Sequence, residues 1–163
     1  MKQIIITTLL CSVGLLNTPA QASPNCVFES SGISISTVAH SRNVTHFKTI
    51  QAHNLHLGFL KGVGTFQLSE YACNHRGVEL FVVVNPSASG QSVSKVLNSV
   101  LSILLKPSDL HVVEPQLSSL TEQDLAQPRS FPGIAELLGF DEFSVQWGEV
   151  NGVPLLVLKS SAN

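Results

Sequence analysis

The sequence is short of basic residues. It holds nine Lys and Arg against eleven Asp and Glu, a formal net charge of −2 at pH 7 with neutral histidines. A protein that binds nucleic acid over a broad surface needs clustered Lys and Arg to neutralise the phosphates. The composition therefore disfavours a nucleic-acid-binding function.

The signatures of common enzymes and metal sites are also missing. The sequence has no Gly-x-Ser-x-Gly elbow, no Walker-type loop and no closely spaced cysteine pair of the kind that binds zinc. It shows no repeats, no low-complexity tract and no inter-domain linker. We expect no metal, no cofactor and a single domain that is not an enzyme of a familiar type.

A secretory pattern is present at the N-terminus. Lys2 is followed by an apolar run at 4–16 and by the ending Ala20-Gln21-Ala22, which suits signal peptidase. The run is shorter than the roughly 20 apolar residues that cross a membrane. We predict a cleaved bacterial signal peptide at 1–22, export to the periplasm or the outside, and a mature domain at 23–163.

Two cysteines, Cys26 and Cys73, remain in the mature chain. An even number of cysteines in an exported protein indicates a disulfide bond. This bond would tie the N-terminus to the third predicted strand and contribute roughly 3–4 kcal/mol of stability in the chain-entropy account. A metal pair or a catalytic thiol is the alternative, which the wide spacing disfavours.

The first half of the mature chain predicts a mostly antiparallel sheet, because its connections are short. Residues 33–38 alternate apolar and polar side chains, as a half-buried strand does. Further strands are expected at 43–60, broken near His53-Asn54, then at 63–68 and at 78–84. The last of these is apolar at nearly every position, so we expect it to be covered on both faces.

One main amphipathic helix is predicted at about 92–105. Its apolar side chains recur with the spacing of a single helical stripe, at Val93, Val96, Leu97, Val100, Leu101 and Leu104. Ser89 or Ser92 can cap its start, and Lys106-Pro107 is expected to end it. We expect the helix to pack on the sheet and to be a principal source of stability.

The remaining elements are predicted to be short. Residues 110–113 have the composition of a strand, and a Ser-x-x-Glu capping box predicts a helix over 120–126. A further helical turn is expected near 133–138, where Gly139 ends it. These elements connect the main helix to the end of the chain.

A C-terminal hairpin is predicted at 143–159. Asn151-Gly152 is the strongest short hairpin signal in the chain, and a two-residue turn there sets Trp147 opposite Leu156 on a buried face. Because Pro154 has no amide hydrogen, its strand is expected to lie at an edge of the sheet or to begin there.

The loop before the main helix is a candidate anion site. A helix N-terminus preceded by small residues presents free amides and a positive dipole end. The candidate residues are Ser87, Ser89, Gly90, Gln91 and Ser92. The alternative is a plain connection built from turn-forming residues.

The same segment resembles one family motif. Residues 80–90 form an apolar strand followed by Asn-Pro and then Ser-Gly, which is similar to the nucleotide loop of diacylglycerol-kinase-like lipid kinases. The resemblance implies a nucleotide phosphate at this loop. The Gly-Gly-Asp-Gly-Thr segment of those kinases is absent from this sequence, so we assign no family.

Histidines are concentrated in the first β-rich region. Five of the six lie there: His40, His46, His53, His56 and His75. Their spacing is not that of a metal site, so we expect solvent-facing or hydrogen-bonded side chains, with a role as pH sensors open. A carboxylate within hydrogen-bond reach of His46, His56 or His111 in a cleft would instead indicate an enzyme of unrecognised type.

Charge is distributed unevenly along the chain. Residues 23–106 hold six basic and three acidic residues, whereas residues 107–150 hold eight acidic residues and only Arg129. Six acids are candidates for contact with a basic partner: Glu122, Asp124, Glu136, Asp141, Glu142 and Glu149. An acidic face would steer such a partner by long-range attraction, and an ordinary solvated face is the alternative.

The expected fold is therefore α+β, a mostly antiparallel sheet packed against one main helix. The leading functional hypothesis is an exported, non-catalytic binding protein, in its sharpest form an inhibitor or immunity protein that meets a basic enzyme or toxin. The alternative is a carrier or sensor of a small anion or lipid, bound at residues 85–92 or between sheet and helix. An enzyme of unrecognised type is the third hypothesis.

Overall fold

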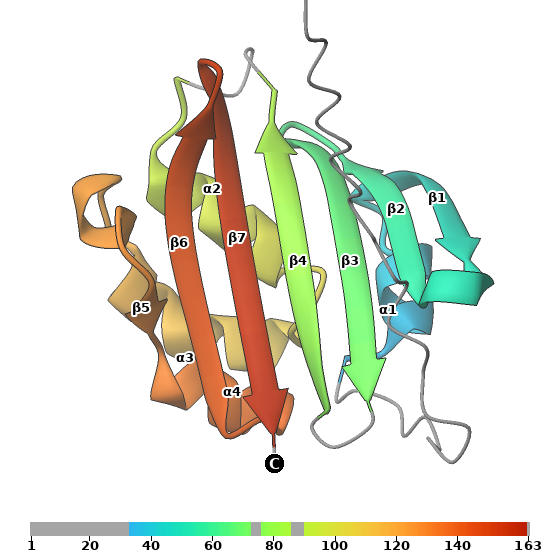
Figure 1. Cartoon of the computed structure of the whole chain (residues 1–163). Helices are drawn as coiled ribbons and strands as arrows, with labels where there is room; N and C mark the ends of the chain where they lie inside the picture. The colour runs from blue at the N-terminus through green and yellow to red at the C-terminus, as the bar shows by residue number, and fades with distance from the viewer. Residues whose placement is uncertain (1–32, 73–75, 86–89, 163) are drawn as a thin grey trace, which may run out of the picture.

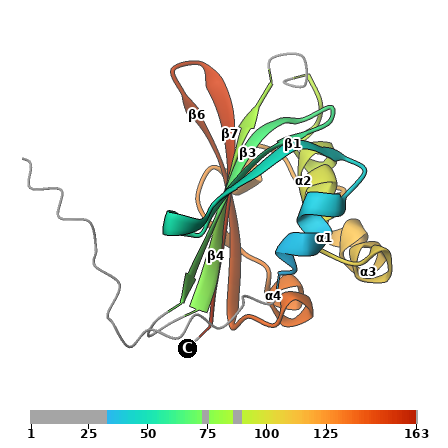
Figure 2. The same ribbon diagram turned by 90° about the vertical axis from the view of Figure 1, so that its right-hand side faces the viewer.

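A computed structural model describes residues 33–72, 76–85 and 90–162. In these residues a seven-stranded antiparallel sheet carries all the α-helices on one face (Figures 1 and 2). This architecture confirms the predicted α+β class. No helix in the described part of the chain is long and apolar enough to cross a membrane.

The elements follow one another in a simple order. The strands are β1 (Val44–Ile50), β2 (Leu55–Leu60), β3 (Gly64–Ala72), β4 (Arg76–Val84), β5 (Arg129–Ser130), β6 (Glu142–Val150) and β7 (Val153–Ala162). The helices are α1 (Ile35–His40), α2 (Val93–Leu101), α3 (Pro107–Leu117) and α4 (Pro132–Leu138), with 3-10 turns η1 (Gln51–His53) and η3 (Gln123–Leu125).

The order of the strands across the sheet is β1-β2-β3-β4-β7-β6-β5. The first four strands form a meander, with the predicted break between β1 and β2 at Asn54, whose φ is 46°. The chain then crosses the back of the sheet through α2, α3 and α4, and returns as β6 and β7. The last strand, β7, pairs with β4 and closes the sheet.

The core lies between the sheet and the helices. Alternate residues of β4 and β7 face the helices and are buried: Val78, Leu80, Val82, Val84, Leu156 and Leu158. The predicted apolar stripe of α2 packs against them, and Leu97 and Leu101 are fully buried. A fully buried Leu contributes about 1.5–3 kcal/mol, so this contact is a principal source of stability, as predicted.

The C-terminal hairpin is confirmed. Asn151 and Gly152 both have positive φ, 52° and 79°, as a two-residue turn of this kind requires. Trp147 pairs with Leu156 and is buried. β7 is not an edge strand but begins at Val153, next to Pro154. Pro154 lies one residue beyond the last pair of β7 with β4, so its missing amide hydrogen is tolerated near the start of the strand.

The strand expected at 33–38 is wrong, because α1 occupies residues 35–40. The Ser34 hydroxyl caps this helix by accepting from the Thr37 amide at 3.2 Å. Packing against β1 then buries Val38 completely. An alternating pattern over only six residues does not distinguish a strand from a helix. Here the Ser34 cap favours the helix.

The strand expected at 110–113 is also wrong, since these residues lie inside α3. Lys106-Pro107 does not end α2, which stops at Leu101, but begins α3 with proline in its first turn. Proline fits there because the first-turn amide has no helical partner. Val113 and Leu117 then form the buried side of the helix.

The two-turn helix expected over 120–126 is reduced to the 3-10 turn η3. The cap is built by Thr121 and Asp124 rather than by the predicted Ser-x-x-Glu box: the Thr121 amide and hydroxyl donate to the Asp124 carboxylate at 2.9 and 2.6 Å. The turn cannot extend because Pro128 disfavours helix at the preceding residue. The helix near 133–138, ended by Gly139 at φ 73°, is confirmed.

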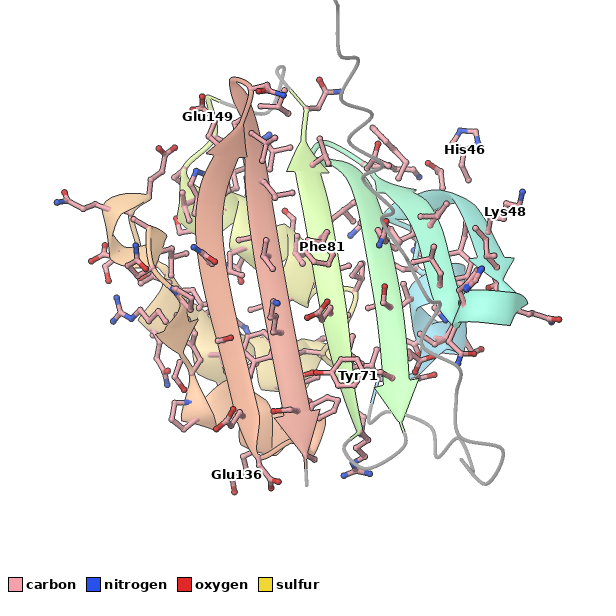
Figure 3. The ribbon with its side chains drawn as sticks, viewed as in Figure 1. His46, Lys48, Tyr71, Phe81, Glu136 and Glu149 are labelled. Carbon is pink, nitrogen blue, oxygen red and sulfur yellow. The ribbon has the colours of Figure 1, made fainter. Side chains whose placement is uncertain are left out.

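One face of the sheet carries no helix in the described residues (Figure 2). The composition of β4 predicts cover on both of its faces, yet the Val83 side chain is 47% exposed. Phe81 and Tyr71 lie on this open face, on the side away from the helices (Figure 3). The described residues therefore leave the second face of β4 uncovered.

Tyr71 lies flat across the open face of β4. Its hydroxyl donates to the Ser160 carbonyl of β7 at 3.0 Å, and a Cβ added at Gly77 would come within 2.3 Å of the ring. Glycine at position 77 therefore lets the ring reach across β4. Burial first, and then the Glu79 carboxylate, raise the pKa of the Tyr71 phenol, while Lys159 lowers it.

Tyr71 is the only tyrosine in the chain, so an absorbance titration reports on it alone. We expect its phenol to ionise above the ordinary value of 10.0 in the folded protein, and Glu79→Gln to move the midpoint down. Because the folded pKa is the higher one, stability is fully present below about pH 10 and falls as the pH rises through the folded value. A midpoint at or below that of a free tyrosine would contradict the packing of this ring.

Candidate functional site

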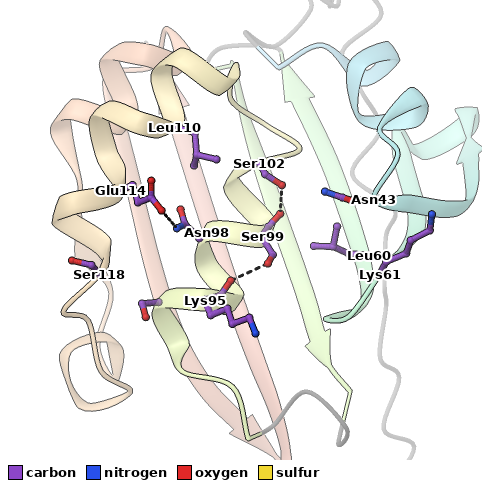
Figure 4. Close-up of a pocket in the computed structure, with 11 residues that line it drawn as sticks. Asn43, Leu60, Lys61, Lys95, Asn98, Ser99, Ser102, Leu110, Glu114 and Ser118 are labelled. Atoms are coloured by element: carbon purple, nitrogen blue, oxygen red, sulfur yellow. Dashed lines mark hydrogen bonds between the residues drawn. The ribbon is translucent and has the colours of Figure 1, made fainter.

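A groove runs along the outer side of α2, which we call the α2 groove (Figure 4). Its volume is about 570 Å³. The lining residues come from three parts of the fold: Asn43, Leu60 and Lys61; Ser94, Lys95, Asn98, Ser99 and Ser102 of α2; and Leu110, Glu114 and Ser118 of α3. Volumes of this size hold small ligands.

Two lysines give the groove its positive charge. Lys61 follows β2, and its ammonium group donates to the Arg42 carbonyl at 2.7 Å, which fixes the direction of the side chain. Lys95 projects from the first turns of α2. Glu114 is the only acid in the lining, so the groove carries an excess of one positive charge.

Three serine hydroxyls of the groove donate their hydrogens to helix carbonyls. Ser99 donates its hydroxyl hydrogen to the Lys95 carbonyl at 2.9 Å, and Ser102 donates to the Ser99 carbonyl at 2.7 Å. Ser118 likewise donates to the Pro115 carbonyl at 2.9 Å. With their hydrogens committed, these oxygens offer lone pairs to donors on a ligand. The groove thus combines cationic donors with neutral acceptors.

The wall between α2 and α3 holds an unpaired polar atom. Asn98 donates through its Nδ2 to the Glu114 carboxylate at 3.2 Å, but its carboxamide oxygen is buried and no group in the described residues donates to it. A buried acceptor without a donor costs about 1–3 kcal/mol. Such atoms are few in native proteins. The unpaired oxygen of Asn98 therefore destabilises the fold at this wall of the groove.

A histidine–carboxylate pair lies at the rim of the groove. His111 Nδ1 is 3.3 Å from the Glu114 carboxylate, which lines the groove. This contact meets the distance part of the condition set above for an enzyme, but His111 itself does not line the groove. His111 is largely exposed, and the other Glu114 oxygen accepts from Asn98. The pair is therefore an exposed contact beside the groove.

A second histidine pair lies in the core side of the sheet. His56 Nε2 is 3.2 Å from the Glu70 carboxylate, its Nδ1 is 3.0 Å from the Thr49 hydroxyl, and Phe47 stacks on the ring. His56 is buried, and neither it nor Glu70 lines the α2 groove. This arrangement is a hydrogen-bonded histidine of the kind expected from the spacing. Within the described residues no group of three or more His, Cys, Asp or Glu could hold a metal ion.

The predicted anion loop is only partly described. Ser87 and Ser89 lie outside the described residues. Gln91 donates to the Gly62 carbonyl at 3.1 Å, so its amide ties the loop to the β2–β3 turn. Ser92 is the N-cap residue of α2 by position, but its hydroxyl contacts that of Ser94 at 3.0 Å instead of capping an amide. Gly90 is exposed.

The six candidate acids are not gathered at one place. Glu149 lies near the turn between β6 and β7, and Glu136 lies on α4 at the opposite end of the sheet (Figure 3). Asp141 and Glu142 stand at the start of β6, and Glu142 accepts from Ser161 at 3.5 Å. These acids therefore lie at both ends of the sheet.

The remaining two acids belong to the turn η3. Asp124 caps this turn, and hydrogen bonds from the Thr121 hydroxyl and amide lower the pKa of its carboxyl group. Arg129 also lies 3.8 Å from Asp124, while Glu122 opens the turn. Asp124 is thus accounted for by local structure.

The groove residues were visible in the sequence only as polar positions of a helix. Ser94, Lys95, Asn98 and Ser102 lie opposite the apolar stripe of α2, which by itself indicates a solvent-facing side. The meander brings Lys61 beside them, and no local pattern signals this approach. Cys26 and Cys73, the predicted disulfide pair, lie outside the described residues.

Comparisons of the chain with protein-family models, with curated proteins and with solved structures give no match. The chemistry of the α2 groove is therefore the guide to function.

Proposed function

We propose that this is an exported, non-catalytic binding protein that holds a small anionic ligand in the α2 groove. One observation carries the proposal: Lys61 and Lys95, from separate elements, line one hollow with hydroxyl oxygens whose hydrogens are already committed. The ammonium groups suit a carboxylate or phosphate, and the hydroxyl oxygens suit donors on the same ligand. The expected ligand class is a small hydroxylated anion, such as a sugar acid or a sugar phosphate.

This proposal develops the carrier hypothesis and not the inhibitor hypothesis. An acidic docking face needs its charges to act together, within about a Debye length of roughly 10 Å at moderate salt. Glu136 and Glu149 lie at opposite ends of the sheet, and Asp124 serves a local cap (Figure 3). Export, the cleaved signal peptide and the Cys26–Cys73 disulfide remain predictions from the sequence.

A thermal-shift screen tests the proposal, with inorganic phosphate, gluconate and glycerol 3-phosphate as probes and glycerol as the neutral control. A ligand at 100 times its dissociation constant stabilises a folded protein by about 2.7 kcal/mol, which raises the melting temperature measurably. We expect an anionic probe to stabilise the protein and glycerol to leave it unchanged.

Two variants locate the site. Lys61→Gln and Lys95→Gln should each weaken binding about tenfold or more by calorimetry, because each removes a charge-assisted contact. Lys48→Gln is the matched control, since Lys48 lies on β1 and does not line the groove (Figure 3). Absence of any shift, or equal loss in the control, would overturn the proposal.

A second candidate, an enzyme, is favoured only by the His111–Glu114 pair at the rim. General acid–base work needs a proton-transfer group within reach of a bound substrate. NMR spectra of each stabilising probe, taken before and after long incubation, separate the two candidates. An altered probe with the native protein but not with His111→Asn would favour the enzyme, and an unaltered probe favours the carrier.

A further inference from the structure

The open face of the sheet can be mapped row by row from the strand pairing. From β2 to β6, through β3, β4 and β7, the first row reads Phe59, Thr65, Val83, Leu155 and Gly148. The second row reads Leu57, Gln67, Phe81, Val157 and Gln146. The third reads Leu55, Ser69, Glu79, Lys159 and Ser144. The fourth, from β3 onward, reads Tyr71, Gly77, Ser161 and Glu142.

The first two rows contain no charged residue. Their centre is a block of four apolar side chains on β4 and β7, namely Phe81, Val83, Leu155 and Val157. Val150 and Val153 extend it toward the hairpin turn and are 58% and 36% exposed. Contiguous apolar surface of this kind on a soluble domain indicates an interaction site.

The map has an internal symmetry about the line between β4 and β7. Residues at equal distances from this line match in chemistry: Phe81 with Val157, Val83 with Leu155, Glu79 with Lys159, Gln67 with Gln146, and Ser69 with Ser144. A two-fold axis along this line would place each of these residues opposite its match in a second copy. Phe81 and Val83 would face Val157 and Leu155, and Glu79 would face Lys159. In the fourth row Tyr71 would face Glu142.

We infer that two copies of this chain pack face to face through the open side of the sheet, with the two-fold axis along β4 and β7. Such a contact is isologous, and an isologous contact requires a surface that is complementary to itself. Glu79 and Lys159, 2.9 Å apart within one copy, would each also face the opposite charge of the other copy. Phe81 and Val83 would then gain the second cover that the composition of β4 predicts.

The size of the face suits a dimer. Five strands about 4.8 Å apart, over four rows of roughly 7 Å, give a flat footprint of roughly 650 Å². Accessible surface exceeds a flat footprint, so the face approaches the ~800 Å² that each partner contributes to a standard interface. The α2 groove lies on the helical side of the sheet and would stay open in the dimer (Figure 2).

The other possible occupants fit less well. A strongly charged partner would meet two uncharged rows at the centre of the face. Residues 23–32, the part of the chain between the predicted cleavage site and the first described residue, hold only Val27 and Phe28 as large apolar side chains. Fully extended, these residues reach about 33–36 Å, but as a single extended segment they would cover only about one strand's width of the face.

Sedimentation velocity on the protein purified from cells that express the full sequence tests for the dimer. We expect the sedimentation coefficient to rise from monomer to dimer as the concentration increases to about 100 µM, the range of weak specific complexes. Val83→Lys should weaken the dimer at least about tenfold. Val112→Lys is the matched control, because Val112 is an exposed apolar residue on α3, and this variant should dimerise normally.

A charge-exchange experiment tests the axis itself. Glu79→Lys alone would face its copy's Lys159 with like charge, and Lys159→Glu alone would face Glu79 in the same way. Each variant should be monomeric with native far-UV circular dichroism, and an equimolar mixture should dimerise, because only the mixed pair faces opposite charges. A purely structural role of the Glu79–Lys159 pair would not be restored by mixing.

Three results would overturn the inference: a wild-type protein that stays monomeric over the whole concentration range, a dimer unaffected by Val83→Lys, or a mixture of charge variants that stays monomeric. Stable co-purification of a different molecule that Val83→Lys releases would also overturn it, since that molecule would then be the occupant of the face.

Discussion

Leu97→Asp is expected to unfold the protein. Leu97 is fully buried at the centre of the α2 stripe, between the helix and the middle strands. The change removes an apolar contact worth about 1.5–3 kcal/mol and buries a carboxylate without a partner, which costs several kcal/mol more. Domains of this size have only about 5–15 kcal/mol of stability in total. Far-UV circular dichroism and a melting curve measure the loss.

Val112→Asp is the control for this experiment. Val112 also lies on a helix of the same layer, but its side chain is 66% exposed. An exposed position tolerates aspartate within about 0.5 kcal/mol. If Leu97→Asp retains a cooperative melting transition near that of the control, the assignment of the α2 stripe to the core would be wrong.

Gly64→Ala is expected to have the second largest effect. A Cβ at this position would lie 2.0 Å from the Val83 carbonyl oxygen and 3.0 Å from the Asn85 amide nitrogen, both of them backbone atoms. Hydrogen-bonded backbone cannot move aside as a side chain can, so β3 and β4 must separate at this end of their ladder. We expect a loss of about 3 kcal/mol or more in urea unfolding.

Gly148→Ala gives the matched comparison, since Gly148 also lies in a strand but has no atom within 4 Å of the added Cβ. Alanine there should leave stability unchanged or raise it by up to about 1 kcal/mol, because it restricts the unfolded chain. Equal effects of the two substitutions would show that the close approach of β3 and β4 is not present in solution.

The elements that the sequence predicts well are those whose signal is both local and long. The apolar stripe recurs along all nine residues of α2, and Asn151-Gly152 favours the positive φ angles that the hairpin turn has. Gly139 ends α4 for the same reason. In each case the local sequence strongly prefers one conformation before any tertiary packing occurs. Packing then stabilises this conformation and does not have to change it.

The elements that the sequence predicts badly are short and decided by packing. Two of the four residues at 110–113 are β-branched valines, which favour a strand. Pro107 nevertheless starts a helix, and Val113 and Leu117 of this helix are buried in the core. Residues 33–38 alternate like a strand, yet the Ser34 cap and the burial of Val38 favour a helix. Propensities of a few tenths of a kcal/mol per residue are overridden by burial worth several times more.

The candidate site was less predictable than the fold. The acidic residues of 107–150 are close in sequence, which predicts one acidic face. In the structure Glu136 and Glu149 lie at opposite ends of the sheet, so closeness in sequence does not make them neighbours. The α2 groove depends instead on Lys61 arriving beside the polar side of α2 through the turns of the meander. The topology of the sheet brings these residues together, and no local sequence pattern predicts that approach.

The position of β7 also affects when the protein can fold. The last strand of the chain fills the middle of the sheet between β4 and β6, so one edge of β4 stays unpaired until the C-terminus is available. Pairings between segments far apart in sequence form late, because the chain between them must first be closed into a loop. The sheet therefore cannot be completed before Val153–Ala162 have been synthesised. A sheet completed this late would be compatible with the export that the N-terminal sequence predicts, because an exported chain crosses the membrane before it folds.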